Sequence, residues 1–221
     1  MTFIPNGHGV LPAYTVPPRA PTGLRRFAVP PPPPQADPQE RCDLCGEQLA
    51  ETHPHMVDLE HRSIACACTA CALLFTRPAG RYRTVPDRVR DDPDAPLTDA
   101  EWAELAIPVS VAFFFVNSAL GHVVASYPSP AGVTECELDL AAWDRLAQTH
   151  PLLGSLIPDV EAILVVREPV PQAFLLPIDM CYALAGALRL NWHGFDGGAE
   201  VRRIIREFIA QLRQRARTRE A

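Results

Sequence analysis

The stretch CDLCGEQLAETHPHMVDLEHRSIACACTAC, residues 42–71, decides how the first structured part of this chain folds. Cys42 and Cys45 are three positions apart, and Gly46 supplies the backbone freedom that a tight turn needs. Cys68 and Cys71 repeat this spacing after residues 46–67, a length that accommodates a β-hairpin. The pattern is typical of a zinc ribbon, in which two cysteine turns hold one ion.

Four thiolates complete a tetrahedral shell and leave no position for water. We therefore predict a structural metal site at Cys42, Cys45, Cys68 and Cys71, with zinc as the ion. A rubredoxin-like iron site is the alternative, because iron with four cysteines uses the same pair of turns and the ligand type does not separate the metals. Rubredoxin turns usually carry glycine soon after each second cysteine, whereas Cys71 is followed by ALLF, and this departure favours zinc.

Other ligand-type side chains lie between and beside the two cysteine turns. Cys66 is interpreted as a small buried residue, with a substitute ligand or a redox-active neighbour as the alternatives. His53 and His55 would project to the same face of an extended strand, so a second metal site is an alternative to plain surface histidines such as His61. Asp58 is a candidate for orienting one of these histidines.

Apart from these metal-ligand candidates the sequence contains no recognisable catalytic motif, so we do not predict an enzyme. An enzyme with an open zinc site would need one of the four cysteines to be a non-ligand, with a histidine and a water completing the shell. The formal charge of −6 argues against nucleic-acid binding, which normally needs a basic face. We expect a protein partner instead.

The composition is that of an ordinary globular protein, with 48% hydrophobic and 21% charged residues. Seven cysteines, most of them clustered between residues 42 and 71, favour thiolate ligands in a reducing cytoplasm over a disulfide framework. The longest apolar run, residues 105–124, is interrupted by Pro108, Asn117 and His122, so we expect no membrane span.

Changes in composition along the chain predict four parts. Residues 1–40 form a proline-rich flexible arm, which includes the proline run at 30–34. Residues 41–80 form the zinc-ribbon-like metal module, and residues 81–97 are expected to be a linker because prolines and mixed charges break the pattern. Residues 98–216 are the larger domain.

The larger domain is predicted to be α+β, with a mainly antiparallel sheet packed with helices. Thr98 and Glu101 form a capping box for a short first helix, while Asp139 and Asp179 are expected to cap later helices. The Asp179 helix should end near Leu190. Strands are expected at 109–117, 121–127, 133–138, 161–167 and 173–176, and further helices at 139–150 and 199–215.

Several stretches together resemble an uncharacterised bacterial family associated with nickel-iron hydrogenase gene clusters. They are CDLCGE, CACTACALLF, IPVSVAFFFVNS, YPSPAG, PDVEAILV, LPIDMCYALAG and NWHGFDGGAEV, and the resemblance covers about residues 40–213. It implies a cysteine module on an α+β domain and lends no catalytic residues. It also implies a role as an accessory or adaptor protein, with a hydrogenase subunit or maturation factor as partner, or as an iron electron carrier for such an enzyme.

Overall fold

The computed structural model describes residues 40–92, 96–194 and 197–220. The predicted proline-rich arm therefore lies outside the described residues, except for Glu40. Among the helices of the described ranges, none combines the length and the apolar character that crossing a membrane requires.

The cysteine module is built on a three-stranded antiparallel sheet. Strands β1 (His55–Asp58) and β2 (Ser63–Cys66) form the hairpin that the spacing between the cysteine pairs predicts. Strand β3 (Tyr82–Thr84) pairs with the other edge of β1, which gives the order β2-β1-β3. Helix α2 (Thr69–Phe75) follows the hairpin, so the second cysteine pair lies at the start of a helix.

A six-stranded antiparallel sheet forms the centre of the larger part, in the order β4-β9-β8-β5-β6-β7. The prediction of an α+β fold with a mainly antiparallel sheet is confirmed. The strands are β4 (Arg90–Asp91), β5 (Val111–Asn117), β6 (His122–Ser129), β7 (Gly132–Cys136), β8 (Glu161–Val166) and β9 (Gln172–Pro177).

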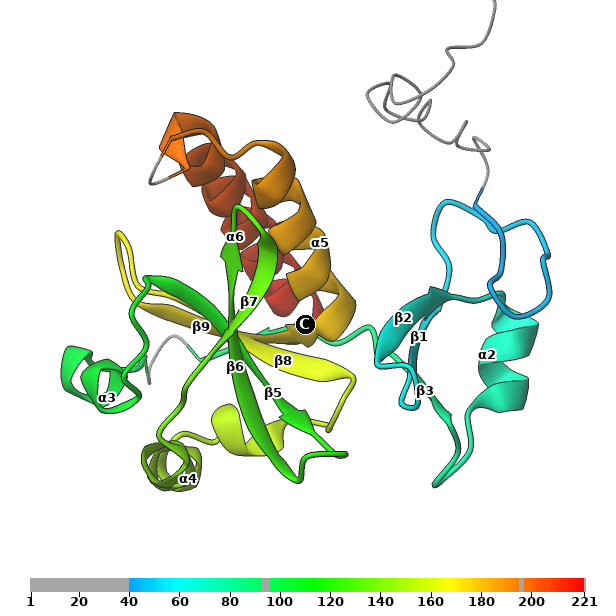
Figure 1. Ribbon diagram of the computed structural model, residues 1–221, viewed down its shortest axis with the longest axis horizontal. Coiled ribbons are helices and arrows are strands. Elements are labelled where there is room, and N and C mark those ends of the chain that lie inside the picture. Colours follow the sequence, from blue (N-terminus) through cyan, green and yellow to red (C-terminus); the bar gives the residue numbers. More distant parts are fainter. Residues whose placement is uncertain (1–39, 93–95, 195–196, 221) are drawn as a thin grey trace, which may run out of the picture. The chain divides into compact units, whose positions relative to one another are not determined.

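Helices cover both faces of this sheet, as Figure 1 shows. Along β5, Phe113 and Phe115 pack in the core with α5 (Ile178–Leu190) and α6 (Gly198–Glu220), whereas Ala112 and Phe114 pack on the opposite side. That opposite core includes residues of α4 (Leu140–Thr149) and of the 3-10 helix η1 (Leu153–Ser155), with Trp102 of α3 (Asp99–Glu104) packed against it. The alternation of side chains along a strand explains why β5 is apolar almost throughout.

Two of the three predicted helix caps are confirmed. Thr98 and Glu101 form the capping box of α3, and the Asp139 carboxylate accepts a hydrogen bond from the Ala142 N–H at the start of α4. The prediction that Asp179 caps α5 is wrong, because the chain enters this helix directly from β9 and Pro177 is the N-cap. Asp179 lies in the first turn, and its side chain contacts the cysteine module instead.

The segment predicted as a linker, residues 81–97, contributes a strand to each sheet, β3 to the smaller and β4 to the larger. Arg83 of β3 also reaches the larger part, where its Nη1 donates to Asp159 Oδ2 at 2.6 Å. Asp159 in turn accepts from the Ser118 N–H at 2.8 Å. This buried carboxylate therefore ties the β3 strand to the turn after β5.

Candidate metal centre

The first cysteine turn is closed by backbone hydrogen bonds. The Cys42 N–H donates to the Glu47 carbonyl at 2.8 Å, and the Gly46 N–H donates to the Cys42 carbonyl at 2.8 Å. Gly46 has a φ of 76°, in the left-handed region that side chains with a Cβ rarely adopt. This turn holds Cys42 buried and Cys45 exposed.

The second cysteine turn is the start of α2. Cys68 is the N-cap of this helix, and its sulfur accepts a hydrogen bond from the Cys71 N–H at 3.4 Å. Cys71 lies in the first helical turn and is buried. The second pair is therefore held by helical geometry rather than by a glycine turn.

The four sulfur atoms come together as the spacing predicts. The Sγ atoms of Cys42, Cys45, Cys68 and Cys71 all lie within 4.8 Å of one another, and those of Cys45 and Cys68 are 3.7 Å apart. A tetrahedron with sulfur atoms about 2.3 Å from one ion has edges of about 3.8 Å. All four cysteines are free thiols, so the cluster can hold one metal ion.

The thiols of this cluster differ in their tendency to ionise. Burial opposes ionisation of Cys42, but backbone N–H groups, that of Cys68 foremost, lower its pKa to about 6. Burial and the neighbouring thiols raise the pKa of Cys71 to about 12. A cation is therefore needed for all four sulfurs to be thiolates together, because close negative charges oppose one another.

Cys66 does not belong to this cluster. It lies on β2 directly opposite His55 of β1, and its ligand atom groups with those of His53 and His55. The sequence contains one indication of this grouping. A hairpin between the cysteine pairs brings the start of its first strand, near His55, beside the end of its second strand, near Cys66. Register was not predictable from the spacing alone, and the pairing of Cys66 with His55 was missed.

Asp58 contacts His61, as predicted for its candidate role in orienting a histidine, but it has a second partner, Arg81, that the sequence does not indicate. His61 Nδ1 lies 2.9 Å from Asp58 Oδ2 and 2.6 Å from Arg81 Nη2, and Arg81 Nε donates to Asp58 Oδ1 at 2.9 Å. The Arg81 guanidinium, together with His61, holds the pKa of the buried Asp58 carboxyl well below its usual range. The charge of Asp58 is thus already balanced without a metal ion.

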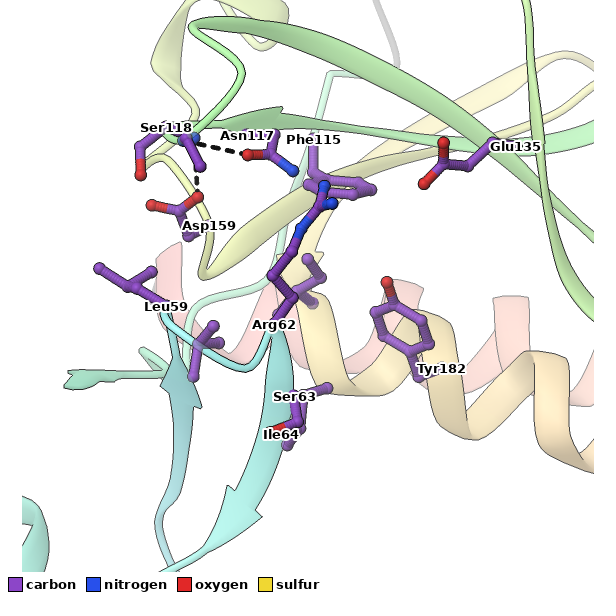
Figure 2. A pocket seen from close by; sticks show the side chains of 13 residues that line it. Leu59, Arg62, Ser63, Ile64, Phe115, Asn117, Ser118, Glu135, Asp159 and Tyr182 are labelled. Atoms are coloured by element: carbon purple, nitrogen blue, oxygen red, sulfur yellow. Dashed lines mark hydrogen bonds between the residues drawn. The ribbon is translucent and has the colours of Figure 1, made fainter. Parts of the chain in front are cut away.

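A pocket of about 520 Å³ lies beside the β1–β2 hairpin. Figure 2 shows Arg62 extending from the hairpin turn toward the ring of Phe115, with Glu135 and Tyr182 also lining the space. Its lining combines apolar side chains with groups of both charges. The pocket is not predictable from the sequence, because its walls come from segments far apart along the chain.

Comparison with known proteins gives a family and no characterised relative. No curated protein and no solved structure matches the chain. A family model matches residues 41–216, from the residue before the first cysteine into the last helix, and its description assigns no function. The match includes no hydrogenase link, so that association remains a prediction. The chain belongs to the family of unknown function DUF5947.

Proposed function

We propose that the protein is a non-enzymatic accessory or adaptor protein whose cysteine module is stabilised by one zinc ion. The observation that carries the proposal is the convergence of four free thiols within 4.8 Å, at a spacing that fits tetrahedral thiolate coordination. Four sulfur ligands saturate zinc, so this centre stabilises a fold rather than activating a substrate.

Zinc is preferred to iron because of the second cysteine turn. Cys71 belongs to the first turn of α2 and is followed by helical residues, unlike the glycine-containing turn of a rubredoxin-like site. The alternative function is an iron electron carrier, and the exposure of Cys45 favours it, since a sulfur ligand at the surface gives electrons a short path to a partner.

A surface on α2 supports the adaptor role. Leu73, Leu74 and Phe75 follow the buried Ala72 in α2, and they are 76%, 64% and 45% exposed. Adjacent exposed apolar side chains of this kind mark interaction surfaces. A metal centre at the start of α2 would hold this surface rigid for a protein partner, with a hydrogenase subunit or maturation factor as the partner that the sequence resemblance suggests.

The first test is the identity of the metal. We would purify the full chain from medium containing both zinc and iron, determine its metals by mass spectrometry, and record visible spectra before and after dithionite. We expect zinc, no iron and no visible absorption. Iron with thiolate charge-transfer bands that bleach on reduction would replace this proposal with the electron carrier.

Cysteine variants then assign the metal to its ligands. Cys42→Ser and Cys71→Ser should each lose about one equivalent of zinc and lower the thermal stability, because a three-thiolate site no longer closes the shell. Cys136→Ser, which changes a half-buried cysteine of the six-stranded sheet, is the matched control and should retain its metal. Retention of metal and stability by both test variants would refute the four-cysteine site.

The partner is tested separately. The double variant Leu73→Asp with Leu74→Asp should abolish co-purification with nickel-iron hydrogenase subunits and leave the zinc content unchanged. Leu120→Asp changes an exposed leucine in the turn after β5 and serves as the control. Binding that survives the double variant would exclude the α2 surface, and the absence of binding by the unmodified chain would exclude this partner.

A further inference from the structure

Three ligand-type side chains gather at the open end of the β1–β2 hairpin, apart from the four-cysteine cluster. His53, His55 and Cys66 each place one ligand atom within 4.8 Å of the others. His53 and His55 are separated by one residue, and Cys66 is the cross-strand partner of His55. Two imidazoles and one thiol are donors that late first-row transition metals prefer.

The hydrogen bonds of His53 leave one nitrogen ready to bind a metal. Its Nδ1 lies 2.9 Å from the Ala50 carbonyl oxygen, which can only accept, so Nδ1 carries the proton. The lone pair of the neutral ring is then on Nε2. The side chain is only 7% exposed, and within the described ranges no group lies at hydrogen-bond distance from Nε2.

An unpartnered buried nitrogen is uncommon in a folded protein, because buried polar groups normally have hydrogen-bond partners. The nearby Glu40 Oε2 is 3.7 Å from His53 Nε2, which is too long for a hydrogen bond. A metal ion at Nε2 would satisfy this nitrogen. The Glu40 carboxylate is also within reach of such an ion as an oxygen ligand.

His55 is oriented in the same way by a carboxylate. Its Nδ1 lies 2.5 Å from Asp179 Oδ2, and an ionised carboxylate only accepts, so the lone pair of the neutral ring is again on Nε2. Carboxylates that hold the second nitrogen of a histidine are a recurrent feature of metal sites. Asp179 lies in the first turn of α5, so this helix places the carboxylate behind His55.

Cys66 is held in place by the first cysteine turn. Its N–H donates to Asp43 Oδ2 at 2.7 Å, and its carbonyl accepts from the Asp43 N–H at 2.9 Å. Asp43 lies between Cys42 and Cys45, so the backbone that orders one group of ligands also orders the other. The remaining group of this kind, Asp58 with Glu60 and His61, differs because Arg81 already balances the charge of Asp58.

From these contacts we propose a second metal site in which His53 and His55 bind through Nε2 and Cys66 binds through Sγ. The ion is a late first-row divalent metal, for which Zn²⁺ is the probe. Three protein ligands leave a fourth coordination position for water, for Glu40 or for a ligand atom of a partner. This site goes beyond the proposed function and does not depend on the identity of the metal at the four cysteines.

The experiment compares metal stoichiometry in the full chain. After incubation with Zn²⁺ and removal of loosely bound ions, the unmodified chain should contain about two metal ions, and His53→Gln, His55→Gln and Cys66→Ser should each contain about one. Cys136→Ser is the control and should contain as many as the unmodified chain. A single ion in the unmodified chain, unchanged in all three variants, would overturn the second site and leave the four-cysteine site intact.

Cobalt resolves which cysteine binds. Co²⁺ added to chain that holds zinc only at the four cysteines, with the second site empty, should produce a thiolate-to-cobalt charge-transfer band, which disappears in Cys66→Ser and is weakened in His53→Gln. The band would persist in Cys66→Ser if another thiol were the ligand, and this result would overturn the assignment. Loss of both metals in Cys66→Ser with retention of both in His53→Gln and His55→Gln would also overturn it, by assigning Cys66 to the four-cysteine cluster.

The role of Asp179 is tested by measuring the affinity of the second site for Zn²⁺, because a weakened site can still contain metal. Asp179→Asn removes the negative charge behind His55, and it should weaken Zn²⁺ binding at the second site by roughly 10- to 100-fold. The four-cysteine site should keep its metal in this variant. An unchanged affinity would show that Asp179 does not orient a metal ligand.

Discussion

At the scale of single residues, a buried ion pair secures the start of β8. Glu161 is inaccessible to solvent, and Arg88 binds it through two contacts, from Nε to Oε1 at 2.7 Å and from Nη2 to Oε2 at 2.6 Å. The Ile157 N–H donates to the same carboxylate at 2.9 Å. The cost of burying Glu161 is therefore offset by a guanidinium and a backbone donor.

Arg88→Met should lower the free energy of unfolding by about 3 kcal/mol, because it leaves the carboxylate of Glu161 buried without its counter-charge. Urea denaturation followed by circular dichroism measures the change. Arg145→Met removes an exposed arginine from its pair with Glu104 and is the control, with an expected change of less than about 1 kcal/mol. Equal effects of the two variants would contradict the importance of burial.

The pair formed by Glu101 and His150 affects the stability of the protein in acid. The side chain of His150, helped by the Thr98 N–H, lowers the pKa of Glu101 from 4.5 to about 2. The unfolded chain therefore binds more protons in this range, so the stability from this pair is complete above pH 4.5 and is lost as the pH falls toward 2.

Glu101→Gln should therefore reduce the loss of stability between pH 4.5 and pH 2, by at most about 1 kcal/mol because the carboxylate is partly exposed to solvent. Urea unfolding at several pH values measures this difference. Glu104→Gln, on the same helix and in an exposed pair, is the control. An identical pH dependence of stability in Glu101→Gln and the unmodified chain would show that the ionisation of Glu101 does not contribute to acid stability.

Among the helices and strands, the helix caps show when the local sequence is sufficient to predict a structural feature. Asp139 caps α4 as predicted, because the N–H group that it binds belongs to Ala142, only three residues further along the chain. The same residue type at Asp179 does not cap α5, since the helix follows β9 directly with Pro177 as its N-cap, and the Asp179 carboxylate contacts His55 instead. Local pattern predicts a cap only when no tertiary partner competes.

Asp139→Ala should destabilise the protein by about 1 kcal/mol, because the Ala142 N–H at the start of α4 loses its acceptor. Thermal and urea unfolding measure the effect. Asp144→Ala, at an exposed position of the same helix, should change the stability by less than about 0.5 kcal/mol. A cap role would be refuted if the two substitutions had the same effect.

In the segment predicted as a linker, by contrast, the local sequence does not predict the strands that form. Residues 81–97 contain β3 and β4, although prolines and mixed charges predict an irregular segment. Both strands are short edge strands, of three and two residues, and each is held by a neighbour from another part of the chain. Pairing with a preformed strand explains these elements, and a local pattern does not encode it.

At the scale of the whole molecule, the packing separates the cysteine module from the large sheet only in part. Met56, Ala67 and Ala72 form a small core with Cys42 and Cys71. Val57, from the same strand as Met56, belongs to the core that includes α5 and α6. The small core has few apolar side chains, so we expect its stability to depend on metal.

Removal of metal with a zinc chelator should unfold the module and spare the large sheet. Hydrogen exchange measured by mass spectrometry should then show loss of protection in peptides from residues 42–84, while β5 and β8 remain protected. The unmodified chain with excess Zn²⁺ is the control. Simultaneous loss of protection in β5 and β8 would contradict the predicted division into a module at 41–80 and a domain at 98–216.

Elements whose signals are local can be predicted from the sequence of this chain. Two CxxC pairs predict the four-cysteine cluster, and apolar strands with capped helices predict the α+β fold, because spacing and capping act between residues close in the chain. By contrast, the grouping of Cys66 with His53 and His55, and the position of Asp179 behind His55, depend on how distant segments pack. Hairpin register and the approach of α5 are set by packing between distant segments, and no local pattern in a single sequence specifies such packing.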